Sequence, residues 1–309
     1  MVTRAPSFAI LVLAALAPAT VSAAEAWAAP WWVWPIALFT VTFLLGIVAV
    51  LAGVGGGVLF VPIVAGFFPF HLDFVRGAGL LLALSGSLSA APELLRRGFA
   101  SLRLALPLAL AGSTTAIFGA MVGLALPTAI VQTALGAVVL LIVLLTWRMP
   151  GVDGPRASQP DALSVALRLS GVFHDRAEAR DIDWQAHRTP SGLAAFAAIG
   201  LMGGMFGLGA GWANVPALNL VMGVPIKLAV GTSTLAISIS NTSAAWVYLN
   251  HGALLPILHV PSILGVMLGA RVGAHLLQRV RSATAHRIML VLLAIAGVRA
   301  LAKGLGIWE

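Results

Sequence analysis

The sequence predicts an all-α, multi-pass membrane protein made of two inverted repeats, with about eight to ten membrane segments. Three observations carry this prediction: a strongly apolar composition, a glycine-rich cluster that occurs twice, and basic turns whose placement reverses between the two halves. We expect residues 35–147 to form the first membrane repeat and residues 191–305 the second.

The composition places the chain in a lipid bilayer. Hydrophobic residues make up 60% of the chain and charged residues 9%, and the mean hydropathy is +1.01, far from the values of soluble domains. The net charge is +8, but the arginines lie between apolar runs, which favours topological signals over nucleic-acid binding. The chain has no cysteine, so disulfides and thiolate metal sites are excluded, and we expect no metal or cofactor.

Residues 1–24 have the pattern of a targeting segment. A basic start at Arg4 precedes an apolar stretch and then small residues up to Ala24. This pattern predicts either a cleaved signal peptide or an uncleaved N-terminal anchor.

The first membrane repeat begins with an apolar run from residue 35 to residue 70, about twice the length that one crossing needs. The cluster GVGGGVLFVP lies in its middle, at residues 53–62. Glycine and proline both weaken an uninterrupted helix, so the run is either a helical hairpin or one helix followed by a re-entrant half-helix. Further apolar segments follow at 75–95, 102–126 and 129–147.

Residues 148–190 are a hydrophilic connector that we place in the cytoplasm. Acidic and basic residues alternate along it, and several prolines lie near its start. We expect a solvated linker with one short amphipathic helix at 162–173. His174 and His187 lack the spaced partners that a metal site requires.

The second repeat follows the order of the first. Its cluster GLGAGWANVP lies at residues 207–216, within an apolar segment at 191–224, and further segments follow at 228–249, 254–277 and 288–301. An ungapped alignment of residues 53–98 with residues 207–252 superposes the glycines and the proline of the two clusters. The preserved spacing indicates an internal duplication.

Charge placement orients the two repeats. In the first repeat Arg96 and Arg97 occupy the turn after the second apolar segment, whereas the equivalent turn at 250–252 has no fixed positive charge. The next turn of the second repeat carries three arginines between residues 279 and 287. Since short basic turns face the cytoplasm, equivalent turns lie on opposite sides of the membrane. Inverted repeats with helix breaks at equivalent positions indicate a secondary transporter.

The breaks supply the candidate binding site. A half-helix that starts after the glycines presents unpaired N–H groups and a positive dipole end, which suit a small anion. We expect Pro62 and Pro216 early in such half-helices, where a missing N–H costs least. Uncharged polar residues gather after the second break. The predicted substrate-binding residues are Gly53, Gly55, Gly57, Gly207, Gly209, Gly211, Asn214, Thr232, Ser233, Thr234, Asn241 and Arg271.

Each of these residue types also has a structural interpretation. Ser and Thr in membrane helices often bond their own backbone, whereas the amides of Asn214 and Asn241 have more groups to satisfy and are stronger candidates. Arg271 either snorkels to the cytoplasmic interface or is held inside the bundle, where it attracts an anion. Motifs of hydrolases and nucleotide-binding enzymes are absent from the sequence, so we expect no enzyme.

Four stretches resemble the sulfite exporter TauE/SafE family of membrane permeases: residues 53–62, their echo at 207–216, VGTS at 230–233, and residues 265–273. The resemblance covers about residues 35–305. It implies transport of small anions, including sulfite and organosulfonates, across the bacterial inner membrane. One departure is that the first repeat has AGL at 78–80 where the second has TST at 232–234. Because of this departure, a site that needs polar contacts from both halves would be asymmetric.

The expected function is secondary transport of small anions, with export of sulfite or an organosulfonate as the leading hypothesis. Two alternatives stay open: uptake of thiosulfate or another small anion, and a non-transporting membrane scaffold that docks partners on the connector. The expected partners are the small anion and the lipid bilayer. The sequence leaves open whether the chain forms a homo-oligomer.

Overall fold

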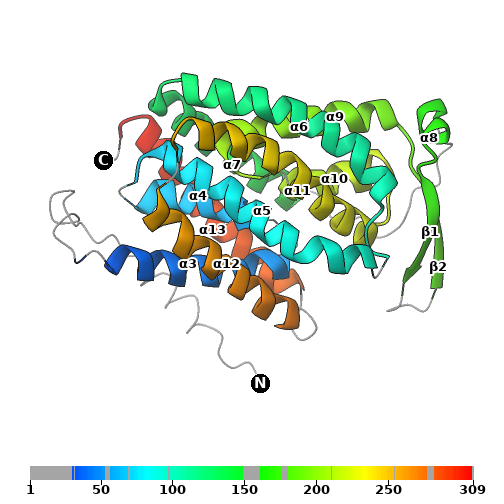
Figure 1. The fold of residues 1–309 in the computed structure, drawn as a ribbon, viewed down its shortest axis with the longest axis horizontal. Helices are drawn as coiled ribbons and strands as arrows, with labels where there is room; N and C mark the ends of the chain where they lie inside the picture. Colours follow the sequence, from blue (N-terminus) through cyan, green and yellow to red (C-terminus); the bar gives the residue numbers. More distant parts are fainter. Residues whose placement is uncertain are drawn as a thin grey trace. The chain divides into compact units, whose positions relative to one another are not determined.

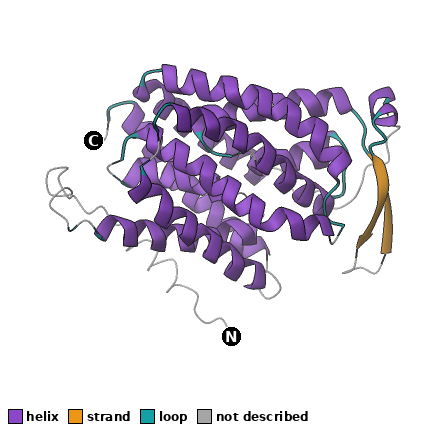
Figure 2. Ribbon diagram, viewed as in Figure 1, coloured by secondary structure: helices purple, strands orange, loops and turns teal. Residues whose placement is uncertain are grey.

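The computed structural model describes residues 30, 32–52, 56–68, 70–96, 98–148, 161–175, 180–209, 211–253, 255–276 and 282–307. The chain divides into two units, Met1–Val33 and Trp34–Glu309. The predicted targeting segment at 1–24 lies outside the described residues. In its described residues, the second unit is a bundle of helices with a β-hairpin (Figures 1 and 2).

The first half of the bundle follows the predicted apolar segments closely. Its helices are α3 (Val33–Ala52), α4 (Gly56–Phe67), α5 (Leu72–Arg96), α6 (Leu102–Ala125) and α7 (Thr128–Arg148). Helix α4 rises only about 18 Å at 1.5 Å per residue, against a hydrocarbon core of about 30 Å. Residues 57–66 of α4 are all buried. A short helix that is apolar on every face belongs inside the bundle, which favours the half-helix over the full hairpin.

The second half repeats this order. Its elements are α9 (Thr189–Phe206), α10 (Gly211–Pro216), the π-helix η1 (Ala217–Val221), α11 (Ile226–Asn250), α12 (Pro256–Leu276) and α13 (Ser282–Gly304). The expectation for the prolines was wrong: Pro62 lies in the middle of α4, and Pro216 is the last residue of α10. Because Pro216 has no N–H, it interrupts the α-helical hydrogen-bond ladder, and the helix continues in the wider π form.

The connector contains more structure than a solvated linker. The helix expected at 162–173 is wrong beyond its first turn, because α8 (Ala162–Ala166) gives way to an antiparallel hairpin of β1 (Ser170–Asp175) and β2 (Arg180–Gln185). Phe173 and Trp184 are buried in a cluster that also contains Leu104 and Leu218 of the membrane helices. Apolar and polar residues alternate in β2, where Ile182 and Trp184 lie between polar residues, but not in β1.

Two glycines show how the halves meet. Helix α5 of the first half packs against α11 of the second. Gly77 of α5 lies against the carbonyl oxygen of Ala253, and Gly231 of α11 lies against the carbonyl oxygen of Phe99. Gly77 is aligned with Gly231, and Phe99 continues the same register to Ala253. Each half therefore contacts the other through equivalent positions.

The outer helix pairs repeat this reciprocity. Helix α6 of the first half packs along α9 of the second, where Gly119 lies against the backbone of Leu201. Helix α12 approaches α3 in the same way, with Gly269 against the backbone of Phe43. The two pairs lie on opposite edges of the bundle in Figure 1.

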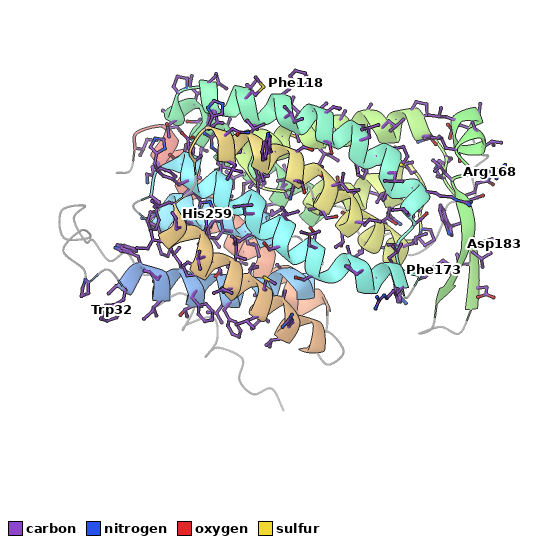
Figure 3. All side chains as sticks on the ribbon, in the orientation of Figure 1. Trp32, Phe118, Arg168, Phe173, Asp183 and His259 are labelled. Atoms are coloured by element: carbon purple, nitrogen blue, oxygen red, sulfur yellow. The ribbon has the colours of Figure 1, made fainter. Side chains whose placement is uncertain are left out.

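The described helices suit a membrane. Three of them are long and apolar enough to span one: Leu72–Arg96, Leu102–Ala125 and Thr189–Phe206. Shorter apolar helical stretches are found in α3, α4, α7 and α12. Large apolar side chains point outward, such as Phe118 of α6, which is 63% exposed (Figure 3). The protein is therefore a polytopic, mostly helical membrane protein, because lipid would cover these side chains.

Candidate functional site: the paired helix breaks

The two glycine-rich breaks meet inside the bundle. A Cβ placed on Gly57, at the start of α4, would lie 2.8 Å from the carbonyl oxygen of Leu208 in the second break and 2.6 Å from that of Gly79 in α5. Gly79 itself lies between Val61 of α4 and the carbonyl oxygen of Gly207. Glycine is needed at these positions because two helix ends and α5 approach with backbone almost in contact.

The second break requires glycine for its backbone shape as well. Helix α9 ends at Gly207, with φ of 69°, and Gly209 follows with φ of 68°. Both are left-handed conformations that side chains rarely adopt. A Cβ on Gly209 would lie 2.9 Å from the Cβ of Ala83 and 3.2 Å from Nδ2 of Asn241. The break therefore exposes its backbone to the Asn241 amide, and Gly211 then begins α10.

Unpartnered polar atoms gather in the helices that follow this break. Asn214 of α10 is 1% exposed, Ser233 of α11 is 2% exposed and Asn241 of α11 is 3% exposed. The Asn214 Oδ1, Ser233 Oγ and Asn241 Nδ2 atoms have no hydrogen-bond partner among the described residues. Buried polar atoms are almost always hydrogen-bonded, so a set of unpaired ones indicates a place for a polar ligand or water.

The neighbouring threonines have structural partners. The Thr232 Oγ1 accepts a hydrogen bond of 3.1 Å from the backbone N–H of Ser101, the residue that caps α6. The Thr234 hydroxyl donates to the carbonyl of Val230 at 2.9 Å. Both hydroxyls therefore hold backbone in place, as hydroxyls in membrane helices often do.

The other predicted substrate-binding residues have different locations. Gly53 and Gly55 lie outside the described residues, whereas Gly57 is at the junction of the two breaks. Arg271 is exposed on α12. The structure thus brings together Gly57, Gly207, Gly209 and Asn241, and it places Arg271 on the outside of the bundle.

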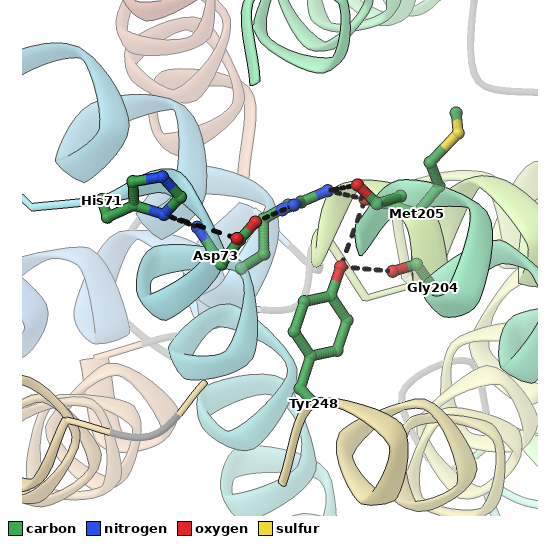
Figure 4. A network of polar contacts seen from close by, with 7 residues as sticks. His71, Asp73, Gly204, Met205 and Tyr248 are labelled. Atoms are coloured by element: carbon green, nitrogen blue, oxygen red, sulfur yellow. Dashed lines mark hydrogen bonds and ion pairs between the residues drawn. The ribbon is translucent and has the colours of Figure 1, made fainter. Parts of the chain in front are cut away.

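One buried charge escaped the sequence analysis. Arg76 of α5 is 1% exposed and pairs with Asp73. Its Nη1 donates to the carbonyl oxygens of Gly123, at 2.9 Å, and Met205, at 3.0 Å. Tyr248 of α11 donates to the Gly204 carbonyl at 3.1 Å (Figure 4). The network therefore holds the carbonyl end of α9 just before the second break.

A sequence signal for this network existed. Asp73 and Arg76 are three residues apart within an apolar helix, a spacing that puts them on the same face. A charged pair inside a membrane segment is costly unless it has a role. Among the described residues, no group of three His, Asp or Glu side chains could hold a metal ion.

The comparisons with known proteins agree with this picture. The family model described as sulfite exporter TauE/SafE matches residues 38–300. The chain is 27% identical over 241 residues to the "Probable membrane transporter protein ORF9" of Sinorhizobium sp, which covers 77% of this chain and 80% of that protein. It is also 27% identical over 120 residues to the "Probable membrane transporter protein YunE" of Bacillus subtilis (strain 168), covering 39% of this chain and 44% of that protein.

No solved structure gives a significant match. The family match covers most of the chain, including both glycine-rich breaks and all the buried polar residues described above. The chain therefore belongs to the sulfite exporter TauE/SafE family and is a membrane transporter, not an enzyme.

Proposed function

We propose that the protein is a secondary transporter that exports sulfite or an organosulfonate across the bacterial inner membrane. The observation that carries this proposal is a pair of buried donors on α11 that have no hydrogen-bond partner among the described residues, Asn241 Nδ2 and Ser233 Oγ, the first of which lies next to Gly209 of the second break. A small oxyanion would take up the donors and relieve the cost of burying them unpaired.

The chemistry of the site favours a small anion with several oxygens. The Asn241 Nδ2 amide and the Ser233 hydroxyl can each donate a hydrogen bond. Residues 211–221 form a continuous helical stretch, α10 with η1, and its N-terminal N–H groups lack partners within the helix. Sulfite and sulfonates present compact oxygen triads that several donors can share. Among the described residues, no carboxylate accepts a hydrogen bond from the Asn241 Nδ2 or Ser233 Oγ groups, so both donors are available to an anion.

Alternating access follows from two inverted repeats. The reciprocal contacts of Gly77 with Ala253 and of Gly231 with Phe99 support a two-fold relation between the halves. The reversed basic turns support opposite orientations in the membrane. In this proposal the halves move against each other around the paired breaks, so that the site opens to one side at a time.

Flux into proteoliposomes tests the proposal. Purified protein would be reconstituted and the uptake of labelled sulfite, sulfoacetate and thiosulfate measured against liposomes without protein. We expect saturable flux of sulfite or sulfoacetate, each inhibited by the other. Saturable flux of thiosulfate alone would replace the proposed substrate with the uptake alternative. The absence of saturable flux for every anion would overturn the proposal.

A further inference from the structure

We propose that Arg76 and Asp73 form a proton-gated anion contact, in which a proton on Asp73 frees one edge of the Arg76 guanidinium for a sulfonate-type oxyanion. This inference rests on the proposed function and adds a coupling ion to it. The contact lies on α5, one turn before Gly79, and its guanidinium bonds the carbonyl end of α9 beside the second break.

The hydrogen bonds of Arg76 leave one edge incomplete. The Nη1 group donates to two backbone carbonyls, while Nη2 donates to Oδ1 of Asp73 (Figure 4). The Nε–H group has no partner among the described residues although it is buried. The Nε–H and Nη2–H groups point the same way and form the edge that binds carboxylates and sulfonates with two parallel hydrogen bonds. Asp73 uses only half of that edge.

Charge makes Asp73 and an anion competitors for this edge. Arg76 carries a positive charge, and inside a membrane protein that charge needs a counter-charge. Asp73 provides it in the structure. When Asp73 takes up a proton it becomes neutral, and the guanidinium then lacks a counter-ion. An anion that replaces the carboxylate restores the balance, so one proton and one negative charge enter together.

The surroundings bring few other titratable groups to the pair. On the N-terminal side of α5, Nδ1 of His71 lies 3.4 Å from Oδ2 of Asp73. Tyr248 of α11 has its ring 5.6 Å from the Arg76 guanidinium carbon. His259 of α12 faces the same turn of α5 at Gly77. Helices α4 and α9 contain no titratable side chain within their bounds.

Exposure falls along the network in the direction of the break. The side chain of His71 is 56% exposed, that of Asp73 is 28% exposed and that of Arg76 is 1% exposed. A proton can therefore reach Asp73 from one surface without crossing the core. Arg76 also donates to the carbonyl of Met205. A change in the partner of the guanidinium, from Asp73 to an anion, therefore acts on the end of α9.

Proton uptake on anion binding tests this inference. Ethanesulfonate is a suitable probe because its charge is constant between about pH 5 and about pH 8, so that any pH effect belongs to the protein. Binding would be followed by calorimetry, and protons by a dye in weak buffer. For the wild-type protein we expect about one proton taken up per anion, and affinity that rises up to about ten-fold per unit of falling pH.

Two variants test whether Asp73 and Arg76 cause the proton uptake that accompanies anion binding. Asp73→Asn imitates the protonated carboxyl, so we expect tight, pH-independent binding without proton uptake. Arg76→Lys keeps the charge but lacks the two-pronged edge, so we expect binding at least about ten-fold weaker. Asp183→Asn, on the exposed hairpin, is the matched carboxyl control and should behave like wild type.

The possible results are distinguishable. Absence of ethanesulfonate binding at every pH would overturn organosulfonate as a substrate and this inference with it. Binding by the wild-type protein without proton uptake would overturn the inference and leave the proposed function standing. Proton uptake that persists in Asp73→Asn would show that another group carries the proton. If Asp73→Asn does not fold, the wild-type protein still decides: ethanesulfonate binding with about one proton taken up supports the inference, and binding without proton uptake overturns it.

Discussion

The two glycine breaks occupy equivalent places in their halves, yet their surroundings differ in chemistry. In the ungapped alignment Asn214 is paired with Phe60, Ser233 with Gly79 and Asn241 with Ser87. The second-half residues carry buried, unpartnered polar atoms. Of the first-half residues, Phe60 and Gly79 have no polar side chain, and Ser87 donates to the carbonyl of Leu84 in its own helix at 2.9 Å.

This difference suggests a division of roles on a duplicated scaffold. Gly57, Gly79 and Val61 of the first half supply close packing around the second break. At the aligned positions compared above, the second half supplies the side chains that can bind an anion, whereas Arg76 of the first half lies at the end of α9 before the break. At the breaks, the duplicated fold thus keeps its backbone geometry while one copy specialises in binding, and the following substitutions test this division.

The largest effect is expected at the paired positions Gly79 and Ser233. A methyl group on Gly79 would overlap Val61 and the carbonyl oxygen of Gly207. We therefore expect Gly79→Ala to lower the free energy of unfolding by about 1–3 kcal/mol, the usual cost of overpacking. Ser233→Ala removes an unpartnered hydroxyl and should leave stability nearly unchanged. Thermal unfolding in detergent measures both, and equal losses would contradict the division of roles.

The next effect is on transport, at Asn241 and Ser87. Asn241→Leu removes a proposed hydrogen bond to a charged ligand, worth about 1.5–3 kcal/mol, so we expect flux of the substrate anion to fall by about ten-fold or more. Stability should not fall, because the amide has an unpartnered group in the free protein. Ser87→Ala is the matched control. Initial rates of proteoliposome flux decide this, and comparable losses in both variants would argue for a symmetric site.

A smaller effect is expected at Thr232. Thr232→Val removes the acceptor of the Ser101 N–H at the start of α6, which should cost about 1 kcal/mol of stability. The substrate affinity of the remaining folded protein should stay within about two-fold of wild type. Denaturation and binding, measured on the same preparation, separate the two quantities. A large loss of affinity at unchanged stability would return Thr232 to the binding site.

The smallest effect is expected at Thr234, whose hydroxyl bonds its own helix. Thr234→Ala should change neither flux nor stability beyond about 0.5 kcal/mol, the usual range for such a site. Flux and thermal unfolding again provide the readout. A strong loss of flux would mean that the Thr234 hydroxyl leaves Val230 to bind the anion during transport.

Much of the fold could be predicted from the sequence because membrane helices have a strong local signal. Apolar length located α5, α6, α7 and α11 to within a few residues, and the doubled GxGxG spacing located both breaks. The hairpin in the connector was missed because its strands are short and its apolar residues pack on the membrane helices, a long-range effect. The positions of Pro62 and Pro216 within their helices were predicted wrongly because the start and end of a half-helix depend on contacts with the backbone of neighbouring helices.

The candidate site was only partly predictable for a related reason. Asn241 could be identified because an amide in an apolar helix is costly wherever it lies. Which hydroxyls have partners depends on contacts between distant residues, such as Thr232 with Ser101. Arg76 was not predicted as a site residue because it lies near the start of a helix. Its burial results from the approach of α6 and α9.

Anion protection of engineered cysteines tests the central claim most directly. The chain has no cysteine, so Ser233→Cys and Ser87→Cys each place a single thiol, one at the buried, unpartnered hydroxyl position of α11 and one at the buried position of α5. Both would be treated with a thiol-reactive reagent with and without sulfoacetate. We predict that sulfoacetate slows modification at residue 233 several-fold and leaves residue 87 unaffected. Equal protection at both, or protection at residue 87 alone, would contradict an anion site at the second break.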